Sequence, residues 1–344
     1  MREAGVRPIV RSESLGVVGL VEVLAHIPRI YGEFRKLIRA ARTERPDLAI
    51  LTDSPDFHLR VAKKLKRLGI PVVYLVAPQI WAWREGRVKI LRETLDHLFC
   101  IFPFEESYFR KHGVTATYIG HPLAGSIAPR LSKADFFEQH GIPSDRPLIA
   151  LLPGSRPGEI GRHIEPLAEA AAILQKQRPL TFIAGTPPGF SKIVGGETFW
   201  ERFHESSIKV IEGSTWDLLA YADLALAASG TVTMEAALLG TPTVTFYRVT
   251  PLTWFLGRRL VKVPFLSMVN LVAERQIVPE LIQQDMTAGR LVEEANRLLD
   301  DPVAREVQKR ALAEVRRLLT ASQDPIDRAA DLIDGMIKVT LGKG

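Results

Sequence analysis

The chain has 344 residues, of which 46% are hydrophobic and 24% are charged. This composition is that of a soluble globular protein, and the length predicts about two domains of roughly 150 residues each. The formal net charge of +6 and the pI near 9.4 favour an anionic partner, without choosing between a nucleotide, a phospholipid surface and nucleic acid.

The positions of cysteine and histidine bear on whether the chain holds a disulfide or a metal site. The single cysteine, Cys100, excludes an intramolecular disulfide, and its apolar neighbours predict a core thiol in a reducing compartment. None of the eight histidines has metal-ligand spacing, and there is no CxxC or HExxH, so we expect no metal. No apolar run approaches the roughly 18 residues of a membrane span, and no signal peptide is visible.

Residues 16–45 begin with a strongly apolar stretch, which is followed by arginines. Apolar surface beside a basic face is typical of a helix that lies at a membrane interface. An amphipathic helix packed on a sheet has the same pattern, and the spacing alone favours this second interpretation.

The first half alternates apolar runs with helical patterns. This alternation predicts a parallel sheet with helices on both faces. A stretch rich in Gly and Pro, residues 120–130, marks a domain boundary. The predicted strands are 47–53, 71–76, 98–102 and 116–119, and the predicted helices after them are 59–68, 87–94 and 106–112.

Asp53 follows the first of these strands. Open α/β sheets bind ligands outside the carboxyl ends of their strands, so Asp53 stands where a catalytic base would stand. Alternatively, Asp53 or Asp56 caps the helix that begins near Phe57. After the second strand, Trp81 and Trp83 could line a pocket for an apolar or sugar ligand, although tryptophan is as often structural.

The second half repeats the alternation. The predicted strands are 148–152, 180–184, 209–211, 224–228 and 243–247. The predicted helices are 132–140, 164–177, 199–205, 216–221, 252–260, 277–281, 288–299, 302–319 and 326–341. Near the C-terminal end of the 252–260 helix, arginines stand beside aromatic residues, which is typical of membrane or nucleic-acid contact, although a solvated helix end is the plainer interpretation.

Two loops in this half join a buried strand to a helix N-terminus. The first holds Gly154, Ser155 and Arg156, and the second holds Gly230 and Thr231, with Glu235 one turn later. Free backbone N–H groups and the helix dipole favour an anion at such loops, and Arg156 adds a forked cation. Each loop alone could be an ordinary turn or a capping arrangement. Two in one domain favour a nucleotide diphosphate, with Glu235 placed to accept hydrogen bonds from a ribose diol.

Several motifs in one order extend over nearly the whole chain. They resemble those of the lipid-A-disaccharide synthases, inverting glycosyltransferases of the GT-B architecture. Each motif is weak by itself, whereas their order and spacing are specific. The motifs are GLVEVL (19–24), DSPDF (53–57), WAWR (81–84), PFE (103–105), IGHP (119–122), LLPGSR (151–156), ASGT (228–231) with Glu235, and RLVK (259–262) through Asn270.

This resemblance implies two Rossmann-like α/β domains facing a cleft. The expected domains are an acceptor- and membrane-side domain over 1–125, a UDP-sugar-binding domain over 126–315 and a helical tail over 316–344. The implied reaction transfers 2,3-diacylglucosamine from UDP-2,3-diacylglucosamine to 2,3-diacylglucosamine 1-phosphate, forms a β-1,6 link and releases UDP. It needs no metal or cofactor. The resemblance also implies a peripheral enzyme on the cytoplasmic face of the inner membrane that can form homodimers. Nucleic acid is not an expected partner, because the basic residues are spread over many helices and no nucleic-acid-binding module is recognisable.

The resemblance also implies roles for single residues. Asp53 would take the proton from the acceptor's 6-hydroxyl. Arg156 and Asn270 match positions important for activity, and Asn270 would be a second polar contact near the donor. Glu235 matches the ribose ligand, and Trp83 joins the expected substrate-binding residues.

The chain departs from the family pattern in four places. An N-terminal strand–loop–helix–strand unit is absent, so the N-terminal domain is expected to be incomplete, with an unfilled sheet edge. His58 stands where Asn is usual. Val269 and Glu274 replace a Pro and a Gly, and Gln276 replaces a Glu.

Two other readings remain open. One is a different UDP-sugar enzyme of the same fold, such as a UDP-N-acetylglucosamine 2-epimerase or a muramyl-type transferase. The other is an inactive relative that binds UDP or membrane without turnover. UDP binding without product would distinguish the inactive relative.

Overall fold

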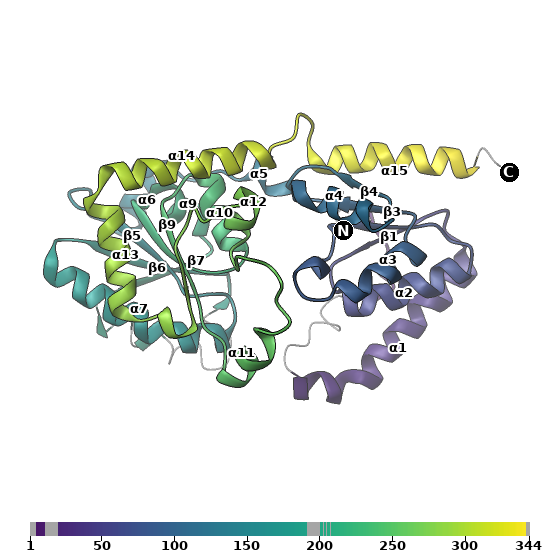
Figure 1. The fold of residues 1–344 in the computed structure, drawn as a ribbon, viewed down its shortest axis with the longest axis horizontal. Coiled ribbons are helices and arrows are strands. Elements are labelled where there is room, and N and C mark those ends of the chain that lie inside the picture. The colour runs from purple at the N-terminus through teal and green to yellow at the C-terminus, as the bar shows by residue number, and fades with distance from the viewer. Residues whose placement is uncertain are drawn as a thin grey trace. The chain divides into compact units, whose positions relative to one another are not determined.

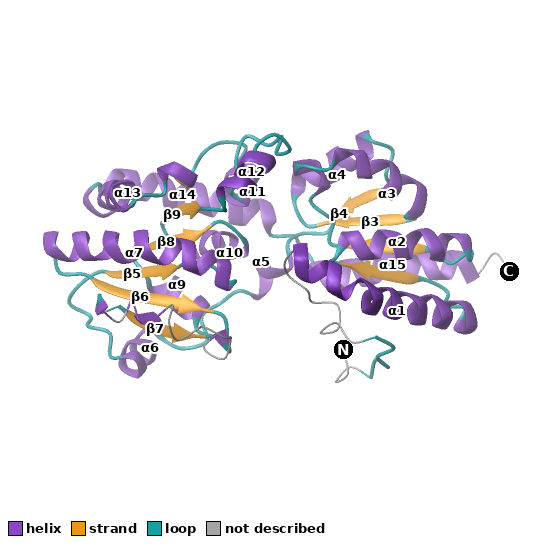
Figure 2. Cartoon of the chain, turned by 90° about the horizontal axis from the view of Figure 1, so that it is seen from below, coloured by secondary structure: helices purple, strands orange, loops and turns teal. Residues whose placement is uncertain are grey.

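A computed structural model describes residues 5–10, 20–190 and 200–341, apart from positions 202, 204 and 207. The chain divides into two compact units, Met1–Ile119 with Gln323–Gly344 and Gly120–Ser322. Each unit is a parallel β-sheet with helices packed on it (Figures 1 and 2), which confirms the predicted class of two α/β domains. The unit limits differ from the expected domain limits, because the last helix groups with the first unit.

In the described residues of the first unit, four parallel strands have the order β1-β2-β3-β4. The strands are β1 (Ala49–Thr52), β2 (Val72–Leu75), β3 (His97–Cys100) and β4 (Ala116–Tyr118). The helices are α1 (Leu20–Glu44), α2 (Pro55–Arg67), α3 (Val88–Thr94), α4 (Pro103–Lys111) and α15 (Pro325–Leu341), with 3₁₀ turns at Ile80–Ala82 and Glu85–Arg87. Residues 16–19 of the first predicted helix lie outside the described residues.

The core of the first unit contains residues from its own strands and from the last helix of the chain. Val73 of β2 and Phe99 of β3 pack with Ala329 of α15, so the last helix covers part of this sheet. Cys100 is buried, which confirms the predicted core thiol, and burial raises its pKa.

The part of the second unit that the structure describes has six parallel strands in the order β10-β9-β8-β5-β6-β7. The strands are β5 (Leu148–Leu152), β6 (Thr181–Thr186), β7 (Lys209–Glu212), β8 (Leu224–Ala228), β9 (Thr243–Tyr247) and β10 (Glu280–Ile282). The helices are α5 (Pro122–Ser126), α6 (Lys133–His140), α7 (Pro157–Gln177), α9 (Thr215–Tyr221), α10 (Thr231–Leu239), α11 (Pro251–Gly257), α12 (Met268–Ala273), α13 (Ala288–Asp300) and α14 (Pro302–Leu319), with a 3₁₀ turn at Gln283–Asp285. From β5 the chain first adds strands on one side and then returns to add β8 on the other. The β5–β8 junction is therefore the topological switch point, where open sheets bind ligands.

Both faces of this sheet are buried. Ile149 and Leu151 of β5 face a core that includes α7 and α13, whereas Ala150 and Leu152 face α6, α9 and α10. Figure 2 shows helices on both sides of the strands. Burial on both faces is why these strands are continuous apolar runs.

The predicted helix at 277–281 is wrong. Residues 280–282 form β10, whose residue Glu280 pairs with Thr245 and whose residue Ile282 pairs with Tyr247. A short apolar run has no readable period, and pairing with the free edge of β9 decides its structure. Similarly, α7 begins at Pro157 rather than at residue 164, because its early glycines hide the helical pattern. The predicted helix at 199–205 lies partly outside the described residues.

One departure from the family pattern has a structural consequence. Glu274 ends α12 with φ of 54°, in the left-handed region that glycine adopts without strain. We therefore expect Glu274→Gly to raise the free energy of unfolding by about 0.5–1 kcal/mol. Thermal unfolding of the second unit measures the change, and Glu274→Ala, which keeps the left-handed strain, should bring no gain.

Candidate functional site

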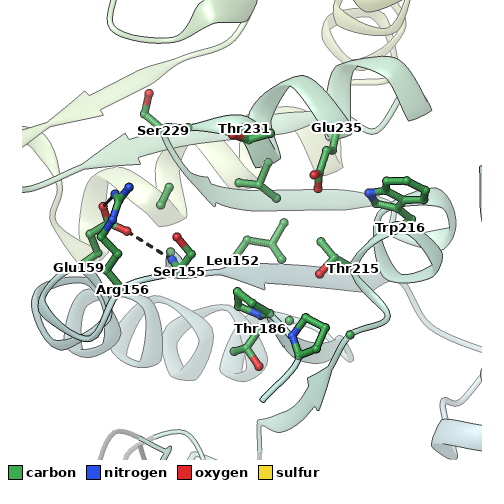
Figure 3. Close-up of a pocket in the computed structure, with 18 of the residues that line it drawn as sticks. Leu152, Ser155, Arg156, Glu159, Thr186, Thr215, Trp216, Ser229, Thr231 and Glu235 are labelled. Carbon is green, nitrogen blue, oxygen red and sulfur yellow. Dashed lines mark hydrogen bonds and ion pairs between the residues drawn. The ribbon is translucent and has the colours of Figure 1, made fainter. Parts of the chain in front are cut away.

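A cavity of about 530 Å³ lies at the switch point of the second unit. The loops that follow β5, β6, β7 and β8 all contribute to its lining. Figure 3 shows their side chains converging from the carboxyl ends of the strands. The volume is within the range of small-molecule sites.

The loop after β5 requires its glycine. Gly154 has φ of 121°, and a Cβ there would stand 3.0 Å from Oε2 and 3.1 Å from Cβ of Glu159. The tight turn brings the Ser155 N–H to Glu159 Oε2 at 3.3 Å. The loop thus lies closely against the first turn of α7.

Glu159 anchors the arginine of this loop. Arg156 Nη1 donates to Glu159 Oε1 at 2.6 Å, and the Tyr247 hydroxyl donates to the same oxygen at 3.3 Å. Burial opposes ionisation of Glu159, but these hydrogen bonds and the charge of Arg156 outweigh it, so the pKa of Glu159 is lowered. The Arg156 side chain remains 62% exposed, so it can contact a ligand while Glu159 holds it.

The loop after β8 places a second helix N-terminus at the cavity. In the described structure no side chain caps α10 at Gly230, so the alternative that Thr231 and Glu235 form a capping arrangement is wrong. The first N–H groups of α10 are therefore available to an anion. A Cβ on Gly230 would meet no atom within 4 Å, so the fold itself does not require glycine there.

This openness predicts that Gly230→Ala separates folding from binding. The added methyl group occupies cavity space without straining the protein, so we expect unchanged unfolding and about tenfold weaker UDP binding, near 1.4 kcal/mol. Titration calorimetry with UDP measures the affinity. The matched control is Gly289→Ala, an equally open glycine at the start of α13, which should leave UDP binding unchanged.

Glu235 points into the other end of the cavity beside Trp216 (Figure 3). Burial raises the pKa of Glu235, and a hydrogen bond from the Trp216 side chain partly offsets this effect. A carboxylate held by an indole N–H has further acceptor positions for hydroxyl donors of a ligand.

Asp53 lies in the first unit, at the carboxyl end of β1. Both Asp53 (φ 58°) and Ser54 (φ 38°) have left-handed backbone conformations, which are strained for residues other than glycine. The Tyr74 hydroxyl donates to the Asp53 carbonyl oxygen, and His58 Nδ1 lies 2.8 Å from the same oxygen. The backbone is thereby held while the Asp53 side chain stays exposed.

The capping alternative for Asp53 and Asp56 is also wrong, because α2 has no side-chain cap. Asp56 pairs instead with Arg84 and Arg87. Burial raises the pKa of Asp56, but the Arg87 and Arg84 guanidinium groups outweigh it and lower the pKa. Trp83 is 45% exposed, with Arg84 Cζ 3.9 Å from its ring centroid, and it does not line the cavity of the second unit.

Asn270 is likewise not in the cavity. It is fully buried, its Nδ2 donates to Val278 O and Glu280 Oε1, and its Oδ1 accepts from two backbone N–H groups. Glu280 in turn accepts from the N–H of Leu266, whose carbonyl oxygen accepts from Ser229 Oγ at the cavity. Asn270 is thus connected to the β8 loop through Glu280 and Leu266, and its contact with a donor stays a prediction.

The structure therefore brings together six of the predicted residues: Gly154, Ser155, Arg156, Gly230, Thr231 and Glu235. Three further parts of the cavity lining were not predicted from the sequence: Glu159, Trp216 and residues 186–188. The Arg–x–x–Glu spacing at a helix start was a usable signal for Glu159. The Thr-Pro-Pro run after a buried strand was a signal for 186–188.

Metal sites and membrane spans are both absent from the described residues. No cluster of His, Cys, Asp or Glu in that part of the chain is arranged to hold a metal ion. No helix there is long and apolar enough to cross a membrane.

Comparison with known proteins adds independent evidence. The family model described as lipid-A-disaccharide synthetase matches residues 1–333. A lipid-A-disaccharide synthase of Solibacter usitatus is 56% identical over 341 residues, which are 98% of this chain and 88% of that protein. Another, of Myxococcus xanthus, is 42% identical over 315 residues, or 91% and 81% of the two chains.

Solved structures are similar in fold at low identity. UDP-GlcNAc 2-epimerase of Neisseria meningitidis bound to UDP-GlcNAc has a TM-score of 0.56 at 11% identity and covers 92% of this chain and 82% of its own. Anabaena HepE in complex with UDP and glucose has a TM-score of 0.53 at 14% identity, with 89% and 81% covered. At these identities the likeness is one of fold alone.

Proposed function

Because this chain belongs to the lipid-A-disaccharide synthetase family, we propose that it joins two acylated glucosamines. The donor is UDP-2,3-diacylglucosamine and the acceptor is 2,3-diacylglucosamine 1-phosphate. The products are the β-1,6-linked disaccharide and UDP. The observation that carries this proposal is the cavity at the β5–β8 switch point, where Arg156 and two helix N-termini meet.

The donor's UDP moiety is assigned to this cavity. The diphosphate lies between the N-termini of α7 and α10, where backbone N–H groups and both helix dipoles favour anions. Glu235 accepts from the ribose hydroxyls. A cavity of about 530 Å³ leaves the acyl chains of the donor outside it.

Departure of UDP is the step that the second unit assists. As the bond from the anomeric carbon to the phosphate oxygen breaks, its electron pair moves to the diphosphate. Preorganised donors at this developing charge stabilise the transition state more than the ground state. Arg156, held by Glu159, supplies a charge-assisted donor without needing to reorganise.

Asp53 is proposed as the general base. Its carboxylate takes the proton of the acceptor's 6-hydroxyl, and the resulting oxygen attacks the anomeric carbon from the face opposite UDP. This displacement inverts the anomeric configuration. The two strained residues at the end of β1 and the double hydrogen bond to the Asp53 carbonyl oxygen support a functional position, since strain of this kind concentrates at active sites.

Product analysis tests the proposal. The chain is incubated with both acylated substrates in detergent, and the product is examined by NMR. A single β-anomeric linkage to the 6-oxygen is the expected result. An α linkage, or hydrolysis of the donor without a disaccharide, would refute the inverting transfer.

The low-identity neighbours make a 2-epimerase the second candidate to test. Incubation with UDP-GlcNAc in deuterated water tests this alternative, because epimerisation removes the proton at C2 and lets deuterium from the solvent replace it. We expect no such exchange. Exchange at C2 would favour this alternative. UDP binding with neither reaction would favour an inactive relative.

We also propose that the enzyme works as a peripheral protein on the cytoplasmic face of the inner membrane, and that it can form homodimers. The support for the membrane is chemical: both substrates carry acyl chains that stay in a bilayer.

A further inference from the structure

The second unit exposes an unusual group of apolar side chains. They belong to residues 251–262, which comprise α11 and the turn after it and are named here the α11 segment. Leu252 is 69% exposed, Phe255 46%, Leu260 53% and Val261 37%. In Figure 1, α11 lies below the β-strands of its unit and apart from them.

Cations stand directly beside these side chains. Arg258 Cζ lies 5.3 Å and Arg259 Cζ 4.8 Å from the ring centroid of Phe255, within the range of cation–π contacts. Lys262 follows at the end of the segment. The sequence holds no Asp or Glu between Glu235 and Glu274, so the charged side chains of the α11 segment itself are all positive.

A cavity of about 690 Å³ adjoins the segment. Trp254, Phe255 and three arginines, Arg162, Arg248 and Arg258, contribute to its lining. Arg248 donates to the carbonyl oxygens of Gln283 and Met286, so its charge is fixed there. An aromatic, positively charged hollow of this kind suits a phosphate that arrives with apolar groups attached.

Charge and polarity together select the partner. A second copy of this surface would set arginines against arginines, which disfavours self-association. Nucleic acid would match the charge but leave Leu252, Leu260 and Val261 facing phosphates. An anionic bilayer accepts both parts, since apolar groups enter between acyl chains and cations remain at the phosphates.

We propose that the α11 segment docks the second unit on an anionic phospholipid surface. Phe255, Leu252, Leu260 and Val261 enter the headgroup–acyl boundary, and Arg258, Arg259 and Lys262 contact lipid phosphates. This inference rests on the membrane association proposed above and assigns it a surface.

Vesicle cosedimentation of the full chain tests the inference. The vesicles are phosphatidylcholine alone or phosphatidylcholine mixed with phosphatidylglycerol. Wild type should bind the mixed vesicles and lose binding as salt rises. Phe255→Ser with Leu260→Ser should weaken binding at least about tenfold. Arg258→Gln with Arg259→Gln should weaken binding to mixed vesicles roughly fivefold for each cation removed.

The matched control is Val303→Ser with Val307→Ser on α14, which removes two other exposed apolar side chains, 71% and 61% exposed. This control should bind like wild type. Transferase activity with detergent-solubilised substrates should be the same in all variants. This activity also shows that the variants fold. It separates failure of the membrane inference from failure of the proposed reaction.

Three results would overturn the inference. They are absence of wild-type binding to mixed vesicles, equal binding by the α11 variants and wild type, and an equal loss in the α14 control. Analytical ultracentrifugation adds a fourth: if the α11 variants turn a dimer into a monomer without a change in vesicle binding, the surface is an interface between copies.

Discussion

Asp53→Asn should lower kcat by at least about 10³-fold, which is near 4 kcal/mol of transition-state stabilisation, while UDP binding stays unchanged. The amide has nearly the same shape as the carboxylate but cannot take a proton at neutral pH. The proposed UDP site is in the other unit, in a cavity that Asp53 does not line. Initial rates of UDP release measure kcat, and calorimetry measures UDP affinity.

Asp56 offers a neighbouring control for this experiment. It is also an exposed carboxylate of the same loop and helix start, but Arg84 and Arg87 already engage it. Asp56→Asn should therefore change kcat by only a few-fold. Equal losses in the two variants would contradict a specific role of Asp53, as would more than a tenth of the wild-type rate in Asp53→Asn.

The second large effect is expected at Arg156. Arg156→Ala should reduce kcat/KM about 10²–10³-fold, since it removes the charge-assisted donor proposed to stabilise the departing diphosphate. Arg156→Lys should recover only part of the loss, because an ammonium group cannot reproduce the forked geometry while it is also held by Glu159. Steady-state kinetics with each substrate varied separates the effect on kcat from that on KM.

Arg290→Ala is the matched control for Arg156→Ala. Arg290 also makes a 2.6 Å hydrogen bond with a glutamate three residues later in the first turn of a helix, but it does not line the cavity. It should leave kcat/KM within about twofold of wild type, since exposed ion pairs contribute little. A similar loss in both variants would indicate general destabilisation instead of loss of a ligand contact.

Much of this fold could be predicted from sequence because its strands are buried on both faces. Runs such as Leu148–Leu152 and Leu224–Ala228 are apolar throughout and are followed by Pro153 and Ser229, and the structure has both strands with those limits. The loops after them were then readable as the ends of adjacent strands. For the same reason, six of the predicted residues lie at one cavity.

What could not be predicted depends on contacts that form only when the chain folds. β10 has three residues and exists because β9 offers an edge, which no local pattern reveals. Asn270 was expected at the donor, yet its side chain is fully occupied by Glu280 and backbone groups that the chain brings together only on folding. Glu159 was hidden because a glutamate near a helix start is ordinarily a capping residue.

The most direct test of this account is the release of UDP by the full chain from UDP-2,3-diacylglucosamine, measured with and without 2,3-diacylglucosamine 1-phosphate in detergent. The account predicts acceptor-dependent release, with one disaccharide formed for each UDP. Binding of UDP without acceptor-dependent release would contradict it, because the cavity would then bind a nucleotide that this chain does not use for transfer.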